Sequence, residues 1–355
     1  MSKALIAMSG GVDSSLAAKL TIDAGFDCIG CTMKLYDGED TSSGSHTCCS
    51  LSDVEDARSV AFKLGIPYYV FNFKDDFNDK VIKHFIESYE AGITPNPCID
   101  CNRYMKFDKL FERAKVLGCD YVVTGHYARI EKADGKFILK KALDASKDQS
   151  YVLYSMTQYQ LEHAMFPLGG LKKTEVRKIA EENSFVNASK PDSQDICFVP
   201  DGDYASFLER ATGKEYPEGD FVDEEGNVLG RHKGLIHYTV GQRKGLGIAL
   251  GVPMFVKKIN TEDNTVVLSS DKALYGKELC LKGFNWISGA VPDGPLRCTA
   301  KIRYKHEEKP ATATPLTDGM VKLEFDEPVR AITPGQAAVI YDSDIVLGGG
   351  TIAKE

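Results

Sequence analysis

The stretch AMSGGVDSSLAAKL, residues 7–20, decides the fold prediction because two glycines flanked by serines join an apolar run to a helix-like segment. Backbone N–H groups and hydroxyls of such a loop surround an anion, and the dipole of the following helix favours negative charge there. Glycine also lets the backbone approach a phosphate closely. The loop has neither the Gly-Lys-Ser/Thr of a Walker A motif nor the Gly-x-Gly-x-x-Gly of a dinucleotide site. We therefore predict a phosphate-binding loop of another kind.

Short apolar runs alternate with helix-like segments over the first part of the chain. Strands are expected at KALIAM, DCIGCTMKLY, PYYVFNF and YVVTG, and helical periodicity covers residues 14–24, 51–64 and 103–117. Strands that alternate with helices predict a parallel sheet covered on both faces. We assign this α/β domain, with the phosphate loop at the end of its first strand, to residues 1–204.

The pattern of the sequence changes after about residue 200, where short apolar runs replace the alternation of strands and helices. Gly and Pro interrupt short runs such as MFVKKI, TVVLSS, TAKIRY, VKLEFD and AAVIYD, which is typical of antiparallel strands in small barrels or sandwiches. A chain of 355 residues is long enough for two or three domains. We expect a central β-rich domain over 205–274 and a C-terminal β-barrel over 275–355.

The composition argues against several classes of protein. With 43% hydrophobic and 26% charged residues and no long apolar run, we expect no membrane-spanning segment. The first residues have too short an apolar core for a secretory signal, so we expect a cytoplasmic protein whose ten cysteines are buried, reactive or metal-binding thiols. The net charge of -8 argues against a general polyanion-binding surface. A local basic groove remains open at RCTAKIRYKHEEK, residues 297–309, for which a solvated strand edge is the alternative.

Two cysteines in separate polar segments are candidates for catalysis. Residues 92–107, GITPNPCIDCNRYMKF, form a predicted loop that enters a helix, which places Cys101 just before a helix N-terminus. That end of the helix dipole lowers the pKa of a thiol and favours the nucleophilic thiolate. Cys197 lies in SKPDSQDICFVPDGDY, at the end of the α/β part. The two thiols share a pocket only if the fold unites these segments, which sequence spacing does not decide.

Six motifs, in order along nearly the whole chain, carry a family resemblance. SGGVDSS is similar to the pyrophosphate loop of the ATP-pyrophosphatase superfamily. Together with NPCIDCN, TGHYA, KDQSYVLY, SQDICF and HYTVGQRKGLG it resembles the tRNA-specific 2-thiouridylases of bacteria. The resemblance implies a tRNA-uridine 2-sulfurtransferase in which an ATP-pyrophosphatase domain precedes two small β domains. It implies that ATP, with Mg²⁺, adenylates the C2 oxygen of the wobble uridine, and that sulfur from a protein persulfide then gives 2-thiouridine, AMP and pyrophosphate.

The resemblance also implies roles for individual residues. Cys197 would carry the persulfide and Cys101 would attack it, which leaves a Cys101–Cys197 disulfide to be reduced. The residues implied to hold ATP, with Asp13 helping the magnesium ion, are Ala7, Met8, Ser9, Gly10, Gly11, Val12, Asp13, Ser14, Ser15, Met33 and Gly125. For Met33, core packing is the alternative. The residues implied to contact tRNA are Asn96 and Pro97, against the target base, and Lys147, Asp148, Gln149, Arg303 and Tyr304.

One position departs from the family pattern. Some members have an aspartate three residues before the nucleophile, where this chain has Cys98, and a thiol replaces a carboxylate poorly. Asp100 is adjacent but need not face the same way, so the acid/base role stays open. Cys98, Cys101 and Cys197 also supply three thiols, enough to hold a [4Fe-4S] cluster with one iron left open for sulfide. We state this cluster as a hypothesis.

Several other residues have a structural interpretation beside a functional one. Cys28 and Cys31 form a Cys-x-x-Cys, but residues three apart in a strand point to opposite faces, so burial is favoured over half a zinc site. For the adjacent Cys48 and Cys49, packing is favoured over metal binding. His126, in TGHYA, either bonds a phosphate or satisfies its own buried surroundings.

The family resemblance implies partners that the composition does not reveal. They are tRNAs with Lys, Glu and Gln anticodons, and a cysteine desulfurase or a sulfur-relay protein as sulfur donor; the sequence does not choose between these donors or reveal the oligomeric state. Another ATP-pyrophosphatase-type synthetase, which adenylates a small metabolite, explains the first loop equally well. That alternative leaves the paired cysteines and the β domains without a role.

Overall fold

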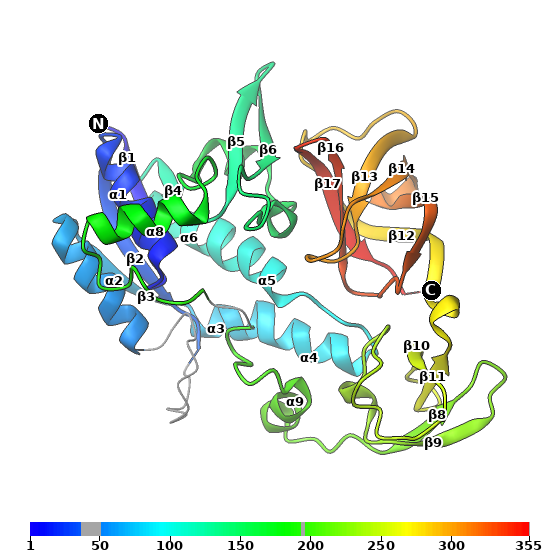
Figure 1. Cartoon of the computed structure of the whole chain (residues 1–355). Helices are drawn as coiled ribbons and strands as arrows, with labels where there is room; N and C mark the ends of the chain where they lie inside the picture. The colour runs from blue at the N-terminus through cyan, green and yellow to red at the C-terminus, as the bar shows by residue number, and fades with distance from the viewer. Residues whose placement is uncertain (37–50, 193–195, 355) are drawn as a thin grey trace.

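A five-stranded parallel sheet forms the core of the N-terminal part. The computed structural model describes residues 1–36, 51–192 and 196–354. The strands lie in the order β3-β2-β1-β4-β7 (Figure 1). Their bounds are β1 Lys3–Ala7, β2 Asp27–Lys34, β3 Tyr68–Asn72, β4 Tyr121–Val123 and β7 Ala164–Met165. The order reverses between β1 and β4, and open parallel sheets bind ligands at such a point, beyond the carboxyl ends of the strands.

Helices cover both faces of this sheet, which confirms the α/β prediction. One apolar cluster joins the sheet to α1 (Val12–Asp23), α2 (Leu51–Leu64) and α8 (Lys173–Glu182). A second cluster joins the other face to α4 (Lys83–Glu90) and α6 (Leu110–Val116). The other helical segments of this part are α3 Lys74–Phe77, the π-helix η1 Asn78–Ile82, α5 Pro97–Asp100, the π-helix η2 Cys101–Lys109, the 3-10 helix η3 Ser150–Leu153, α7 Gln158–Glu162 and α9 Tyr204–Thr212.

The two cysteines of β2 lie in the two different clusters. Cys28 is 3% exposed and packs in the cluster of α1, whereas Cys31 is fully buried in the cluster on the opposite face. Burial raises the pKa of Cys28 to about 11. The pair is therefore structural, as the strand geometry predicts. Cys48 and Cys49 lie outside the described residues.

A small four-stranded sheet follows the α/β part. Its order is β10-β11-β8-β9, in which β8 and β11 run parallel and the other neighbours antiparallel. Its core contains the fully buried Phe221, Val256 and Leu268. The elements of this part are β8 Gly219–Val222, β9 Val228–His232, η4 Leu235–His237, β10 Phe255–Asn260, β11 Thr265–Ser269 and η5 Asp271–Leu274.

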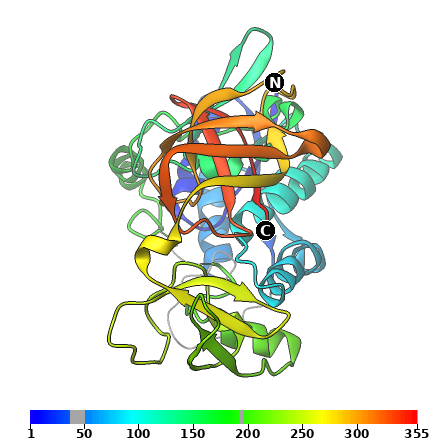
Figure 2. The same ribbon diagram turned by 90° about the vertical axis from the view of Figure 1, so that its right-hand side faces the viewer.

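Six C-terminal strands close into a barrel, as expected (Figure 2). The order is β12-β15-β14-β13-β16-β17, and the barrel closes because β12 pairs with both β15 and β17. Leu281, Leu323 and Ile340 are fully buried in its interior. The elements are β12 Tyr275–Trp286, β13 Leu296–Lys301, β14 Lys309–Pro315, η6 Thr317–Gly319, β15 Val321–Arg330, β16 Ala337–Asp342 and β17 Ile345–Ile352.

A hairpin of the α/β part joins the barrel. β5 (Ala128–Ala133) and β6 (Lys136–Lys141) pair with each other, and β6 meets β17 through Lys140 and Ile345. The hairpin stands away from the parallel sheet, toward the barrel, in Figure 1. Within the described part of the chain, no helix combines the length and the apolar character needed to cross a membrane.

Candidate active site

The predicted phosphate loop lies where the order of the parallel sheet reverses. It leaves the carboxyl end of β1 and enters α1 after Gly11, the N-cap residue. The hydroxyl of Ser14 shapes the turn, since it donates to the carbonyl of Gly11 at 2.9 Å and accepts from the N–H of Ser9 at 3.1 Å. Gly10 has φ 79°, and a Cβ there would lie 2.3 Å from the carbonyl oxygen of Asp53. Both the backbone conformation and the close contact require glycine.

The end of β4 contacts the same loop. A Cβ on Gly125 would lie 2.8 Å from the carbonyl carbon of Asp13 and from the backbone nitrogen of Ser14. The hydroxyl of Tyr127 donates to Oδ1 of Asp13 at 2.8 Å. Burial, and then the charge of Asp13, raise the pKa of Tyr127, so this hydroxyl keeps its proton. Gly125 thus lies beside the phosphate loop, and the family resemblance implies that both hold ATP.

The carboxylate of Asp13 is also held by a lysine. Nζ of Lys173, from α8, lies 2.8 Å from each carboxylate oxygen, and the Lys173 side chain is 10% exposed. Carboxylate oxygen is a ligand that Mg²⁺ accepts, so Asp13 fits the expected role in holding that ion. Any ion bound there competes with Lys173 for the same two oxygens.

The hydrophobic residues expected around ATP differ in burial: two lie in the core and two are only partly buried. Met8 and Val12 are nearly fully buried in the first apolar cluster. Ala7 and Met33 are only partly buried and pack against the second cluster, at the carboxyl ends of β1 and β2. Met33 therefore has both core contacts and some accessible surface.

Cys101 lies inside a helical segment rather than before one. α5 begins at Pro97, and the side chain of Asn96 accepts a hydrogen bond from the N–H of Cys98 at 3.2 Å as the N-cap. The segment continues through η2 and α6 to Val116. The prediction that Cys101 precedes the helix N-terminus is wrong, because Asn96 and Pro97 are residue types that begin helices. The dipole acts more weakly on a thiol one turn into the helix.

Both candidate thiols border the second apolar cluster. Cys101 and Cys197 are each partly buried and pack against it from segments far apart in the sequence. The Cys197 segment is fixed by its neighbour Phe198, whose ring lies 5.7 Å from that of Phe77 and 5.2 Å from that of Phe85, centroid to centroid. The fold therefore brings the two segments to the same face of the parallel sheet.

The three thiols proposed as iron-sulfur ligands do not form a donor set. Among residues 1–36, 51–192 and 196–354, no three His, Cys, Asp or Glu side chains are placed to hold a metal ion. Cys98 is exposed, whereas Cys101 and Cys197 are partly buried. The neighbouring acid, Asp100, turns to His84, with Nδ1 and Oδ2 2.7 Å apart, and this hydrogen bond raises the pKa of His84. The [4Fe-4S] cluster therefore stays a hypothesis.

Two stretches expected to contact tRNA lie against each other. The hydroxyl of Tyr304, in the turn after β13, donates to the carbonyl oxygen of Asp148 at 3.2 Å. The carboxylate of Asp148 accepts from the N–H of Ala142 at 3.0 Å, and Oε1 of Gln149 accepts from the N–H of Tyr127 at 3.0 Å. The Asp148 and Gln149 side chains therefore shape the loop from within.

Arg303 bonds within the protein. Its guanidinium donates to the carbonyl oxygens of Ala331 at 2.7 Å and Val240 at 3.4 Å, and to the hydroxyl of Thr333 at 2.6 Å. Burial lowers the pKa of Arg303. Arg303 therefore ties the central part to the barrel, and the neighbouring Tyr304, 39% exposed, offers more surface to an RNA.

Comparison with known proteins gives full-length relatives. A protein of Clostridioides difficile named tRNA-specific 2-thiouridylase MnmA is 52% identical over 354 residues, 99% of this chain and 98% of the relative. The chain belongs to the tRNA-specific 2-thiouridylase family. Proteins of the same name from Acetivibrio thermocellus and Lachnoclostridium phytofermentans are 53% and 50% identical, and cover 99% and 100% of both chains.

Sequence models of three domain families match consecutive parts of this 2-thiouridylase family member. They are described as the tRNA methyl transferase HUP domain, over residues 2–201, the tRNA methyl transferase PRC-barrel domain, over 205–270, and the aminomethyltransferase beta-barrel domain, over 276–352. The HUP match covers the parallel sheet, and the other two cover the four-stranded sheet and the closed barrel.

Both ring nitrogens of His126 in this 2-thiouridylase family member have partners within the protein. Its Nδ1 lies 2.6 Å from the hydroxyl of Thr124 and its Nε2 lies 3.4 Å from Nζ of Lys106. Burial, and then the charge of Lys106, lower the pKa of His126 well below its ordinary value. The neutral, enclosed ring supports the buried interpretation over phosphate binding.

The site contains residues that sequence reasoning missed. Besides Tyr127 and Lys173, Asn187 contacts the phosphate loop: its Nδ2 donates to the carbonyl of Gly10 and to the hydroxyl of Ser15, both at 2.9 Å. Tyr127 lies within the TGHYA motif and Asn187 lies just before the Cys197 stretch, so their positions in the sequence gave a signal, whereas no motif marks Lys173.

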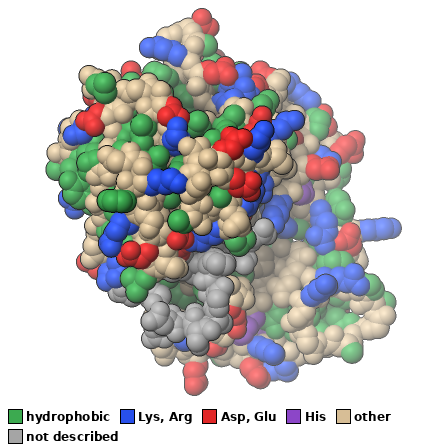
Figure 3. Space-filling view, turned by 60° about the vertical axis from the view of Figure 1, so that its left-hand side comes forward, with side chains coloured by type: hydrophobic (Ala, Val, Ile, Leu, Met, Phe, Trp, Pro, Cys, Tyr) green, Lys and Arg blue, Asp and Glu red, His purple; other side chains and the backbone are tan. Residues whose placement is uncertain are grey.

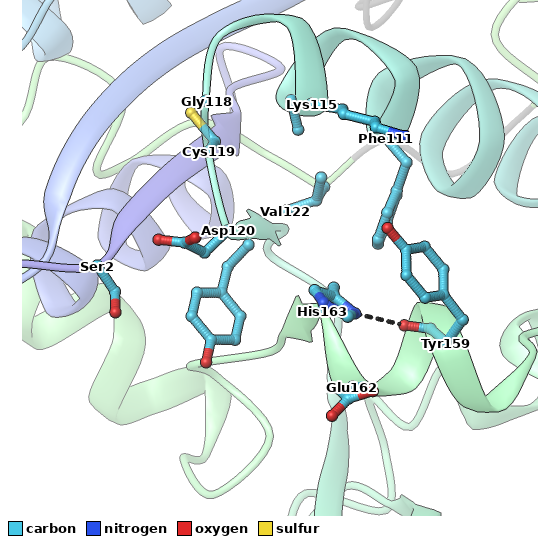
Figure 4. Close-up of a pocket in the computed structure, with 12 residues that line it drawn as sticks. Ser2, Phe111, Lys115, Gly118, Cys119, Asp120, Val122, Tyr159, Glu162 and His163 are labelled. Atoms are coloured by element: carbon cyan, nitrogen blue, oxygen red, sulfur yellow. Dashed lines mark hydrogen bonds between the residues drawn. The ribbon is translucent and has the colours of Figure 1, made fainter.

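A cavity of about 490 Å³ lies at the amino ends of the parallel strands, opposite to the carboxyl ends where the phosphate loop lies (Figure 4). Ser2 and Asp120, at the amino ends of β1 and β4, line it together with His163 and Tyr159. Nδ1 of His163 lies 2.9 Å from the carbonyl oxygen of Tyr159. The phosphate loop follows the carboxyl end of β1, so this cavity and that loop lie at opposite ends of the strands.

Proposed function

We propose that this chain is a tRNA-specific 2-thiouridylase, a tRNA-uridine 2-sulfurtransferase that uses ATP to replace the C2 oxygen of the wobble uridine by sulfur. The observation that carries the proposal is about half identity, over nearly the full chain, with relatives of that name. We propose the three domains assigned from the sequence, 1–204, 205–274 and 275–355. The first contributes its β5–β6 hairpin to the sheet of the third.

The first step is activation of the uridine. The C2 oxygen attacks the α-phosphorus of ATP, the bond to the bridging oxygen breaks, and pyrophosphate leaves with the electron pair. The N–H groups of the loop from Ser9 to Ser15 and the N-terminus of α1 would hold the pyrophosphate, because both favour negative charge. Mg²⁺, held in part by Asp13, would neutralise further charge on the phosphates. Ala7, Met33 and Gly125 would line the adenosine.

The second step is sulfur transfer. Cys197 receives a persulfide from a cysteine desulfurase or from a sulfur-relay protein. The thiolate of Cys101 attacks Sγ of Cys197, the persulfide S–S bond breaks, and hydrosulfide leaves with the electron pair. Hydrosulfide attacks C2 and loses its proton as AMP departs, which gives 2-thiouridine. The Cys101–Cys197 disulfide that remains is reduced by an external dithiol, which supplies two electrons.

The tRNA would bind through local contacts. Lysine and arginine side chains are interspersed with acidic ones on the face in Figure 3, and the net charge of the chain is -8, so that face offers no broad basic surface to an RNA. Asn96 and Pro97 would lie against the target base, and residues 147–149 with Tyr304 would contact the tRNA from the side of the barrel. Binding should weaken as salt rises, since phosphate contacts release counterions.

We place this reaction in the cytoplasm, on tRNAs with Lys, Glu and Gln anticodons.

A sulfur-transfer assay tests the proposal. The protein is incubated with ATP, Mg²⁺, unmodified tRNA, cysteine and a cysteine desulfurase, and 2-thiouridine and pyrophosphate are measured. Cys101→Ser and Cys197→Ser should each abolish thiolation and retain adenylation, whereas Cys280→Ser, at an exposed thiol on β12, should leave both unchanged. Normal thiolation in either of the first two variants contradicts the assigned roles. Pyrophosphate release that ignores tRNA would support a small-metabolite synthetase instead.

A further inference from the structure

A chain of ion pairs runs from the phosphate loop to the loop proposed to contact tRNA. Nζ of Lys173 lies 2.8 Å from both oxygens of Asp13 and 2.7 Å from Oδ1 of Asp192. The other oxygen of Asp192 accepts from Nζ of Lys147 at 2.9 Å. Arg177, one turn beyond Lys173 on α8, donates to Oδ1 of Asp192 at 3.1 Å. Asp192 is therefore shared by three cations, two from α8 and one from the loop proposed to contact tRNA.

The ion pairs differ in solvent exposure: they are most buried at Lys173 and most exposed at Lys147. The side chain of Lys173 is 10% exposed and that of Asp192 26%, whereas that of Lys147 is 36% exposed. Partly buried charges are screened less by water and salt than exposed ones, so the loss of one partner is felt by the next. Lys147 is therefore the residue of this series that an RNA phosphate would reach first, because its side chain is the most exposed and loses the least hydration.

Asp192 also belongs to the segment that carries Cys197. Before it, Asn187 bonds the carbonyl of Gly10, and Lys190 pairs with two acids of α2, Asp53 and Asp56, at 2.6 and 2.7 Å. These contacts anchor the start of the segment around the phosphate loop. A change in the ion pairs of Asp192 would therefore act on the start of the segment whose Cys197 is proposed to carry the persulfide.

From this geometry we infer that Asp192 is a positioning residue that couples tRNA binding to ATP binding, an inference that rests on the proposed function. A tRNA phosphate draws Lys147 away from Asp192. Asp192 then shares its charge with fewer cations and attracts Lys173 more strongly, and Lys173 loosens its hold on Asp13. The carboxylate of Asp13 becomes available to the magnesium ion of ATP. Because coupling between two binding sites is reciprocal, bound ATP tightens tRNA binding by the same factor.

Equilibrium binding measures this coupling directly. The Kd of α,β-methylene ATP with Mg²⁺, an analogue whose bridge is not cleaved, is determined with and without unmodified tRNA. The ratio of the two values should be on the order of ten in the wild-type protein, within the range common for coupled sites. Lys147→Met and Asp192→Asn should each bring the ratio close to one, and the double variant should add nothing. Lys178→Met, at a 75% exposed lysine on the same helix, is the control and should keep the wild-type ratio.

The ratio separates a positioning role from a merely structural one. If Asp192 only stabilises the fold, Asp192→Asn weakens nucleotide binding equally with and without tRNA, and the unchanged ratio overturns the inference. A wild-type ratio of one overturns it as well. Failure of the wild-type protein to thiolate tRNA would count against the proposed function, while the binding ratio would still decide the coupling.

Discussion

Replacing Gly125 by alanine tests whether the end of β4 shapes the phosphate loop. A Cβ at this position would lie 2.8 Å from the backbone of Asp13 and Ser14, and it must retreat by about 0.6 Å to reach the ordinary contact distance of 3.4 Å. Both neighbours are backbone atoms, so the loop itself has to move. Overpacking a tight site costs about 1–3 kcal/mol. If that cost falls on the nucleotide-bound loop, ATP affinity drops about 5- to 150-fold.

Isothermal titration of Gly125→Ala with α,β-methylene ATP and Mg²⁺ measures the loss. Gly170→Ala is the matched control, since a Cβ there meets nothing within 4 Å. The control should bind as the wild-type protein does, and the circular dichroism of both variants should be unchanged. Wild-type affinity in Gly125→Ala would show that the loop does not depend on this contact, and would refute the reasoning.

Three further changes probe the surroundings of the site. Arg303→Met removes charged hydrogen bonds to Ala331 and Thr333, which still bond to each other, and should lower the free energy of unfolding in urea by about 1.5–3 kcal/mol; an unchanged midpoint would contradict the bridging role. Asp100 raises the pKa of His84, so their pair stabilises the fold fully below the ordinary pKa of 6.5 and loses its effect as pH rises through the raised value. His84→Gln should therefore destabilise the protein at pH 6 and not at pH 9; equal effects at both would speak against a charged pair. Tyr127→Phe removes a hydrogen bond to the Asp13 carboxylate and should cost about 1.5–3 kcal/mol in the same urea titration, where no change would mean that water replaces the hydroxyl.

The fold was predictable where the sequence pattern is local. Alternating strands and helices predict the parallel sheet, and the helix expected over 51–64 is α2 with the same bounds. The spacing of Cys28 and Cys31 predicts their opposite faces because strand geometry has a period of two. The β5–β6 hairpin was missed although it is local and turns at Asp134 and Gly135, a dipeptide typical of hairpins. Its docking on β17, which joins Lys140 to Ile345, is long-range and leaves no signal in the sequence.

The error at Cys101 has a local cause. The loop interpretation of residues 92–107 gave weight to the two prolines and overlooked that proline is favoured in the first turn of a helix. Asn96 caps that turn, so the helix begins before the thiol. The helix dipole therefore acts less on this thiol than the sequence analysis predicted.

The sequence by itself determined the phosphate loop, the two β parts and the family, because each depends on short motifs or on periodicity within one segment. Only the tertiary structure decided which side chains meet around Asp13. Asp192 directly precedes the SQDICF motif, but Lys173 lies outside every motif, and Lys173 reaches Asp13 because α8 packs with α1 on the same face of the sheet. Side chains so distant in sequence leave no periodic trace, since their proximity arises only when the helices pack against a common sheet.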